Sequence, residues 1–255
     1  MFREEFLTMC QAAKAKVKFF KGNTLGFFLA SMLAGMFVGF GVLLIFSIGG
    51  MMQNLPYTKI VMGASFGVAL SLVVIAGAEL FTGNNMVMMS GLLNKDVKLL
   101  DVLKVWALCW IGNFIGSFLL AGLFYLGGFA SGSVGEFIAT SSLTKMSVPI
   151  LPLFIRGVLC NILVCLAVWC GFRCKSESGK LIMVFWCLFV FITAGFEHSV
   201  ANMTLLSISL LSPMGVAVSL SGLVYNLVVV TLGNMVGAIL FVALPYYIIS
   251  KKKEG

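Results

Sequence analysis

Six long apolar stretches restrict this chain to a fold that crosses a lipid bilayer. Each reaches the roughly 20 residues that a helix needs to cross about 30 Å of hydrocarbon. They lie at about 24–50, 60–90, 103–126, 148–172, 181–211 and 215–249. The chain is 60% hydrophobic and 10% charged, which excludes a water-soluble domain with a charged exterior. Because no stretch alternates as barrel strands do, the sequence predicts an all-α membrane protein with six transmembrane helices.

The distribution of positive charge predicts how these helices are oriented. Most basic residues fall in the N-terminal segment, in alternate loops and in the C-terminal tail: Arg3, Lys14, Lys16, Lys18, Lys21, Lys95, Lys98, Lys104, Arg173, Lys175, Lys180, Lys251, Lys252 and Lys253. The other loops carry only Lys59 and Lys145. By the positive-inside rule, both termini are expected to be cytoplasmic. The net charge of +8 therefore reflects topology, and no nucleic acid partner is expected.

The chain divides into three parts. Residues 1–23 form a cytoplasmic amphipathic N-terminal segment, residues 24–250 the six-helix transmembrane domain, and residues 251–255 a basic cytoplasmic tail. In the first part, apolar residues recur near helical spacing among lysines: Phe2, Phe6, Met9, Ala13, Val17 and Phe20. This pattern favours a helix on the inner membrane surface, and a solvated basic tail is the alternative.

Two motifs occur once in each half of the chain. The pattern G-x-E-x-x-x-x-N spans 77–84 and 195–202, and G-N-x-x-G spans 112–116 and 233–237. Three helices per half is an odd number, so the second copy enters the membrane from the opposite side. The sequence therefore predicts an inverted 3+3 repeat.

The second and fifth stretches are too long for straight helices. Each holds 31 residues, about 46 Å of helix, and its polar motif begins near the middle. Unpaired Glu79 and Glu197 would each cost roughly 2.5–3.5 kcal/mol at that depth. Irregular backbone is tolerated there only where protein or a cavity satisfies it. Helices 2 and 5 are therefore expected to be broken, and a permeation pathway is the default role of such breaks.

Glycines four residues apart predict close helix packing at Gly35/Gly39, Gly63/Gly67, Gly112/Gly116 and Gly233/Gly237. The asparagines inside the last two motifs, Asn113 and Asn234, are candidates to bond to a broken helix. Residues 127–147 are expected to form the longest external loop. Its Lys145 is either a solvated charge or an attractor of anions at a pore mouth.

His198 is the only side chain here whose ordinary pKa lies near neutrality, and it follows Glu197 in mid-membrane. It is expected to donate a hydrogen bond or a proton to a passing anion, against the alternative of a neutral core histidine. Glu79 and Glu197 are interpreted as caps for the amides freed at the breaks, or else as ligands. Arg156 is a candidate to balance one of them, and Asn161 to bond across a helix interface.

Seven cysteines lie mostly within apolar stretches, which argues for structural thiols rather than a disulfide framework. Cys170 and Cys174 lack partner ligands at metal spacing, and the chain holds one histidine. No metal, cofactor or catalytic residue is expected.

Three segments carry a resemblance to the formate/nitrite transporter family that covers essentially the whole chain. They are 78–84 (AELFTGN), 161–169 (NILVCLAVW) and 195–203 (GFEHSVANM). Within the family the chain most resembles the hydrosulfide-channel branch. The resemblance implies an aquaporin-like protomer of six helices with its own pore. It also implies that these protomers assemble as a homopentamer in the lipid of the cytoplasmic (inner) membrane.

The resemblance also implies roles for individual residues. Thr82, His198 and Asn161 match the pore centre, and Phe66 and Phe191 match the outer constriction. Leu70, Leu80, Phe81 and Val164 lie at or beside the inner constriction, and Lys145 matches a lysine that draws anions into the outer vestibule. Asn84 and Asn202 are expected to support the broken loops together with Glu79 and Glu197.

The expected function is a channel or transporter for small monovalent weak-acid anions such as hydrosulfide, formate and nitrite, with proton sharing at His198. A charged ion in an apolar constriction faces a large desolvation cost that its conjugate acid avoids. The alternative is an aquaporin-type channel for neutral small solutes. An intramembrane cysteine enzyme and an inert scaffold are further alternatives, but the former lacks a cofactor loop and the latter does not account for two buried carboxylates.

Overall fold

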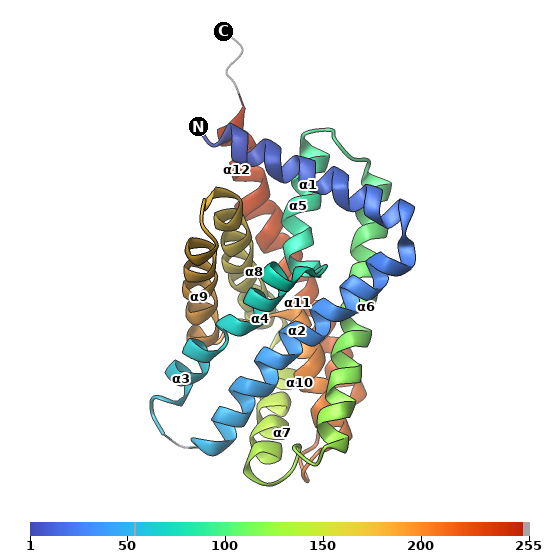
Figure 1. The fold of residues 1–255 in the computed structure, drawn as a ribbon. Helices are drawn as coiled ribbons and strands as arrows, with labels where there is room; N and C mark the ends of the chain where they lie inside the picture. Colours follow the sequence, from blue (N-terminus) through green and yellow to red (C-terminus); the bar gives the residue numbers. More distant parts are fainter. Residues whose placement is uncertain (54, 252–255) are drawn as a thin grey trace.

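The computed structural model describes residues 1–53 and 55–251 as helices joined by short connections (Figure 1). The helices are α1 Arg3–Gly22, α2 Thr24–Met51, α3 Thr58–Ser65, α4 Gly67–Leu72, α5 Phe81–Leu93, α6 Leu99–Leu126, α7 Gly132–Ser147, α8 Ile150–Arg173, α9 Glu177–Ala194, α10 Ser199–Leu211, α11 Leu220–Ala238 and α12 Leu244–Ser250. Two π-helical turns, Val73–Gly77 after α4 and Ile239–Ala243 before α12, complete the helical segments.

Within residues 1–53 and 55–251, six helical segments are long and apolar enough to cross a membrane, as the sequence predicted. They are Thr24–Met51, Thr58–Gly77, Leu99–Leu126, Ile150–Arg173, Glu177–Ala194 and Leu220–Ser250. The second and fifth of these end near the middle of the stretches that the sequence delimited. The chain continues after a non-helical interruption as α5 and α10, which confirms that both helices are broken.

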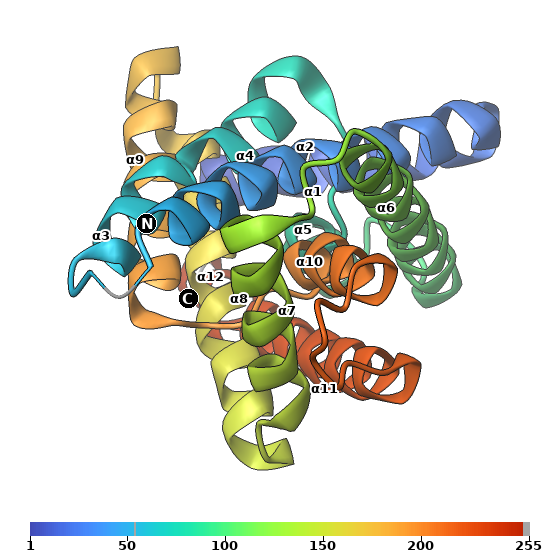
Figure 2. The same ribbon diagram turned by 90° about the horizontal axis from the view of Figure 1, so that it is seen from below.

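The two short helices that follow the breaks run in opposite directions. α5 leads toward the end of the molecule covered by α1, whereas α10 leads toward the end that holds α7 (Figure 1). Seen from the α7 end, α10 lies among α2, α6, α7 and α11 (Figure 2). The two half-helices therefore lead away from the middle of the bundle toward opposite ends.

Glycine pairs bring together the first and third long helices of each half, α2 with α6 and α8 with α11. A Cβ atom on Gly116 would overlap the carbonyl oxygen of Met32, and one on Gly237 would overlap that of Val158. The G-x-x-x-G motifs of α6 and α11 therefore mark backbone contacts between helices, as expected.

Replacing Gly116 with alanine should destabilise the protein, because the new methyl group meets backbone that cannot rotate away. Overpacking of this kind costs about 1–3 kcal/mol, which lowers a melting temperature by on the order of 5 °C. Gly122 lies on the same helix with open space around it, so Gly122→Ala is the matched control. Thermal unfolding in detergent measures both variants, and equal melting temperatures would contradict the close contact.

The apolar face of α1 is buried against protein and does not lie on lipid. This corrects the expectation of a helix on the inner membrane surface. Phe6, Met9, Cys10 and Ala13 are buried against the protein, chiefly α5 and its neighbours. α5 and α12 present an apolar surface to α1. The hydrophobic face of α1 is therefore buried against protein rather than in the bilayer. Of the basic tail, only Lys251 lies within the described residues.

An ion pair fastens α1 to the loop before α6. Lys14 Nζ lies 2.6 Å from Asp96 Oδ1, and Asn94 donates to the other oxygen of the same carboxylate. Burial alone would raise the pKa of Asp96, but the hydrogen bonds from Lys14 and Asn94 outweigh it and hold the pKa below its ordinary value. The carboxylate is therefore charged at neutral pH, and the pair remains intact.

Most of the expected external loop is helical. α7 occupies Gly132–Ser147, and its buried residues Gly135, Ile138, Ala139 and Ser142 recur at helical spacing against α2 and α10. The sequence did not predict this helix, because small and polar residues mask its narrow buried stripe. As a consequence, Lys145 is held on a packed helix.

Candidate functional site

The two breaks have matching backbone geometry. Gly77 and Gly195 adopt left-handed conformations, with φ of 81° and 76°, in which a Cβ atom would be strained. The chain then runs extended before α5 and α10 begin at Phe81 and Ser199. Each glycine therefore ends one half-helix and lets the next start in mid-membrane.

Asparagines from neighbouring helices satisfy the exposed backbone at both breaks. Asn113 Oδ1 accepts from the Phe81 amide at 2.9 Å, and Asn113 Nδ2 donates to the carbonyls of Ser31 and Glu79. In the second half, Asn234 Oδ1 accepts from the Ser199 amide at 2.9 Å. Asn234 Nδ2 donates to the carbonyls of Gly157 and Glu197. The expectation that these asparagines bond to broken helices is confirmed.

The two glutamates do not cap backbone amides, so that interpretation was wrong. Glu79 Oε2 accepts from Asn84 Nδ2 at 2.9 Å and from Lys16 Nζ at 2.6 Å. The Phe81 and Ser199 amides already donate to the side-chain oxygens of Asn113 and Asn234. The two carboxylates therefore accept from side chains instead.

Glu197 repeats this arrangement in the second half. Its Oε2 accepts from Asn202 Nδ2 at 2.6 Å, and its Oε1 from Lys145 Nζ at 2.7 Å. Lys145 rather than Arg156 is thus its charged partner. Glu197 is 3% exposed, and a buried carboxylate is tolerated because it is paired and hydrogen-bonded.

Thr82 and His198 meet between the two breaks. Thr82 Oγ1 lies 3.0 Å from His198 Nε2, and both residues are buried. His198 Nδ1 accepts from the Ala201 amide at 3.1 Å, so the proton of the neutral ring lies on Nε2 and points at the threonine. The Thr82 hydroxyl hydrogen is then free to bond to a third group.

Asn161 supports this centre from α8. Its Nδ2 donates to the Asn234 carbonyl at 2.8 Å and to the Thr82 carbonyl at 3.3 Å. The hydrogen bond from α8 to α11 confirms the expected bond across a helix interface. The structure therefore brings together Thr82, His198 and Asn161, which are distant in the sequence.

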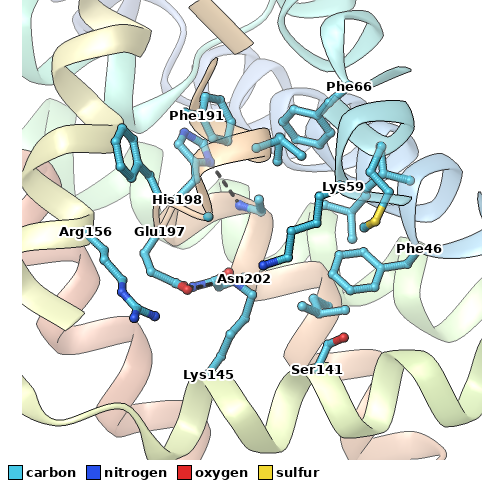
Figure 3. A pocket seen from close by; sticks show the side chains of 18 of the residues that line it. Phe46, Lys59, Phe66, Ser141, Lys145, Arg156, Phe191, Glu197, His198 and Asn202 are labelled. Carbon is cyan, nitrogen blue, oxygen red and sulfur yellow. Dashed lines mark hydrogen bonds and ion pairs between the residues drawn. The ribbon is translucent and has the colours of Figure 1, made fainter. Parts of the chain in front are cut away.

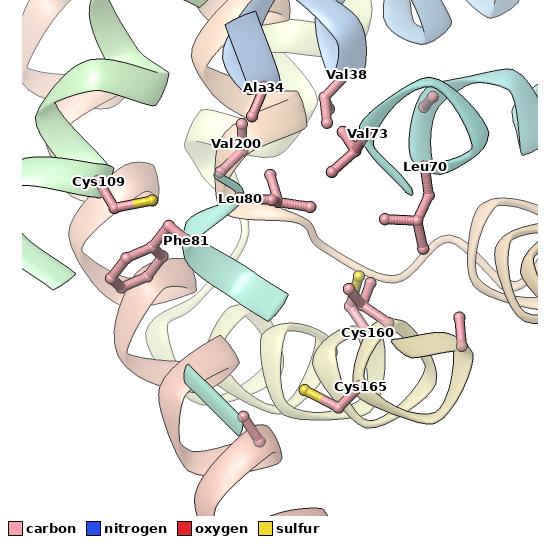
Figure 4. Close-up of a cluster of buried hydrophobic side chains, with 14 of the residues drawn as sticks. Ala34, Val38, Leu70, Val73, Leu80, Phe81, Cys109, Cys160, Cys165 and Val200 are labelled. Carbon is pink, nitrogen blue, oxygen red and sulfur yellow. The ribbon is translucent and has the colours of Figure 1, made fainter. Parts of the chain in front are cut away.

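An apolar constriction of about 10 Å³ adjoins His198, roughly the room for one water molecule. It is lined by Val38, Phe66, Ala69, Leu70, Leu80, Val164, Leu188, Phe191 and His198. The Phe66 and Phe191 rings lie 5.5 Å apart, edge to face. Leu80 and Phe81 point to opposite sides of the chain, and the Phe81 ring lies beside Cys109, away from Leu70 (Figure 4). Phe81 does not line the constriction.

A wider cavity adjoins each side of the constriction. The cavity at the α7 end, here called the α7 vestibule, holds about 260 Å³ and shares Phe66, Phe191 and His198 with the constriction (Figure 3). The cavity at the α1 end, the α1 vestibule, holds about 450 Å³ and shares Leu70 and Leu80 with it. Vestibule, constriction and vestibule therefore follow one another through the protomer.

Each vestibule presents a lysine paired with a glutamate. Lys145 and Glu197 line the α7 vestibule, and Lys16 and Glu79 line the α1 vestibule. Sequence analysis did not single out Lys16, which lay among several lysines of the N-terminal segment. The matching glutamates were the available signal, since each buried carboxylate in the repeated motif needs a cation.

Comparisons with known proteins agree with this architecture. A family model described as formate/nitrite transporter matches residues 3–248. The nitrite transporter NirC of Salmonella typhimurium is 39% identical over 250 residues, which cover 97% of this chain and 92% of NirC. A probable formate transporter of Methanothermobacter thermautotrophicus is 36% identical over 238 residues, covering 85% of this chain and 86% of that protein.

Solved structures show the same fold. An FNT family ion channel has a TM-score of 0.93 at 36% identity, covering 97% of this chain and 99% of its own. A pentameric formate channel with formate bound has a TM-score of 0.80 at 28% identity, covering 91% of this chain and 99% of its own. These relatives are transporters and channels rather than enzymes. The chain therefore belongs to the formate/nitrite transporter family.

Proposed function

We propose that this protein conducts small monovalent weak-acid anions of the formate, nitrite and hydrosulfide class through each protomer. The observation that carries the proposal is the series of α7 vestibule, constriction and α1 vestibule, in which neighbouring cavities share lining residues. His198 lines the constriction and is bonded to the buried Thr82. The names of the relatives, which include a nitrite transporter and a formate channel, support this substrate class.

The positive-inside pattern supports the further proposal that the α1 end lies in the cytoplasm and the α7 end on the outer side of the inner membrane. Large apolar side chains exposed on the long helices, such as Leu29, Phe118, Ile155 and Val228, suit contact with lipid and with other protomers. The pentameric formate channel among the similar structures supports a homopentamer.

In this mechanism an anion enters a vestibule where a lysine offsets its charge, and it sheds water between the Phe66 and Phe191 rings. The Thr82 hydroxyl, polarised by the Nε2 proton of His198, then donates a hydrogen bond to the anion. Hydrogen bonds to charged acceptors are stronger than neutral ones, so the proton shared along this bond offsets part of the desolvation cost.

Uptake should rise as the pH falls from 8 to 5, at equal pH on both sides of the vesicle. While the anionic form predominates, each pH unit raises the fraction of conjugate acid about tenfold, so a shared proton becomes easier to supply. We expect formate and nitrite uptake by proteoliposomes to increase at least about threefold over this range. Constant uptake would contradict proton sharing. Swelling with neutral solutes but not with anions would favour the aquaporin-type alternative.

A further inference from the structure

The α7 vestibule carries more positive charge than the α1 vestibule. Lys59 from α3, Lys145 from α7 and Arg156 from α8 line it together with a single carboxylate, Glu197. The α1 vestibule is lined by one lysine and one glutamate, Lys16 and Glu79. The two ends of the pathway are therefore electrostatically different.

Glu197 does not form an ion pair with Arg156. One carboxylate oxygen of Glu197 accepts from Lys145 and the other from Asn202. Among the described residues, neither Arg156 nor Lys59 takes part in an ion pair, and no acidic side chain satisfies the guanidinium. Figure 3 shows Lys59 and Arg156 reaching toward Glu197 from opposite sides.

Arginine and lysine offer different chemistry to a small anion. A guanidinium presents parallel N–H groups in a planar fork, which bind two oxygens of one anion, whereas an ammonium acts as a point charge. Formate and nitrite are planar anions with two equivalent oxygens, and hydrosulfide has a single heavy atom. A free fork at the mouth therefore distinguishes anions that simple charge attraction does not.

We propose that Arg156 is a specificity-determining residue whose guanidinium docks planar two-oxygen anions in the α7 vestibule before they reach the constriction. This inference rests on the proposed anion conduction and adds a preference for formate and nitrite over hydrosulfide. Lys59 contributes attraction without that preference.

The test compares Arg156→Lys, Arg156→Gln and Lys59→Gln in right-side-out membrane vesicles that contain the full-length protein. Arg156→Lys keeps the charge and removes the fork. We expect it to raise the half-saturating concentration of formate and nitrite about threefold, and Arg156→Gln about fivefold, the size of an exposed ion pair. The half-saturating concentration of hydrosulfide should change less than about twofold in Arg156→Lys. Lys59→Gln should raise all three values alike.

The proposal would be overturned if Arg156→Lys had the wild-type half-saturating concentration for formate. It would also be overturned if the half-saturating concentration for hydrosulfide rose as much as that for formate. If hydrosulfide does not permeate, the comparison of Arg156→Lys with the wild type for formate decides alone. A proposed function that was itself wrong would give a different result, namely no flux of any of the three anions in the wild type. Size-exclusion chromatography of each variant shows that the protein remains assembled.

Discussion

Replacing His198 with phenylalanine is expected to reduce formate and nitrite flux about ten- to a hundredfold, which corresponds to losing one hydrogen bond to a charged group. The phenyl ring fills similar space but removes the Nε2 proton that polarises Thr82 Oγ1. It also removes the Nδ1 acceptor for the Ala201 amide, which is the N-terminal cap of α10. Uptake by proteoliposomes, normalised to reconstituted protein, measures the loss.

His198→Asn separates these two roles. An asparagine oxygen caps a helix N-terminus well, so the Ala201 amide remains satisfied. The shorter side chain does not reach Thr82 with a donor, so flux should stay low while thermal stability returns to near the wild-type value. Wild-type flux in His198→Asn would show that His198 acts only as a cap. Thr82→Ser, which keeps the hydroxyl, should conduct, and Thr82→Val should not.

The sequence predicted the positions of the breaks because an uninterrupted membrane helix rarely carries a glutamate and a flexible glycine together in mid-span. It did not predict which polar group satisfies which other group. Glu79 and the neighbouring amides lie close in sequence, but the amide of Phe81 bonds to Asn113 on another helix. Assigning that partner requires the distance between α5 and α6, which no local pattern contains.

The same limit accounts for the remaining differences. Lys16 reaches Glu79 only because α1 docks on the membrane domain, an event governed by packing rather than by charge pattern. Leu80 is the last residue of the extended segment and Phe81 the first of α5, and their side chains point to opposite sides of the chain, so only Leu80 faces the constriction. To choose between the two residues, one must know where the short extended segment ends and which side each of its residues faces. The amino-acid composition does not determine this.

Replacing Asn234 with leucine should largely prevent folding. The change leaves two buried backbone groups at the break without their partner, the Ser199 amide and the Glu197 carbonyl, and removes a second bond to the Gly157 carbonyl, which still accepts within α8. Each buried group left unpaired costs about 1–3 kcal/mol, and their sum reaches the lower end of the whole stability of many proteins, about 5–15 kcal/mol. The yield of assembled protein after detergent extraction, measured by size-exclusion chromatography, should fall to a small fraction of the wild type.

Asn113→Leu should have a similar effect, since Asn113 makes the same three kinds of contact at the other break. Asn85→Leu is the matched control, because Asn85 is equally buried but its Nδ2 has no partner within the described structure. Its Oδ1 accepts only a long bond of 3.4 Å from Asn161 Nδ2, which keeps its shorter bonds to the Asn234 and Thr82 carbonyls. Replacing a poorly satisfied amide by an apolar side chain of similar volume is close to neutral. Equal yields for the three variants would show that burial rather than hydrogen bonding makes these asparagines necessary. A loss confined to Asn113 and Asn234 would mean that each break depends on a side chain from a neighbouring helix.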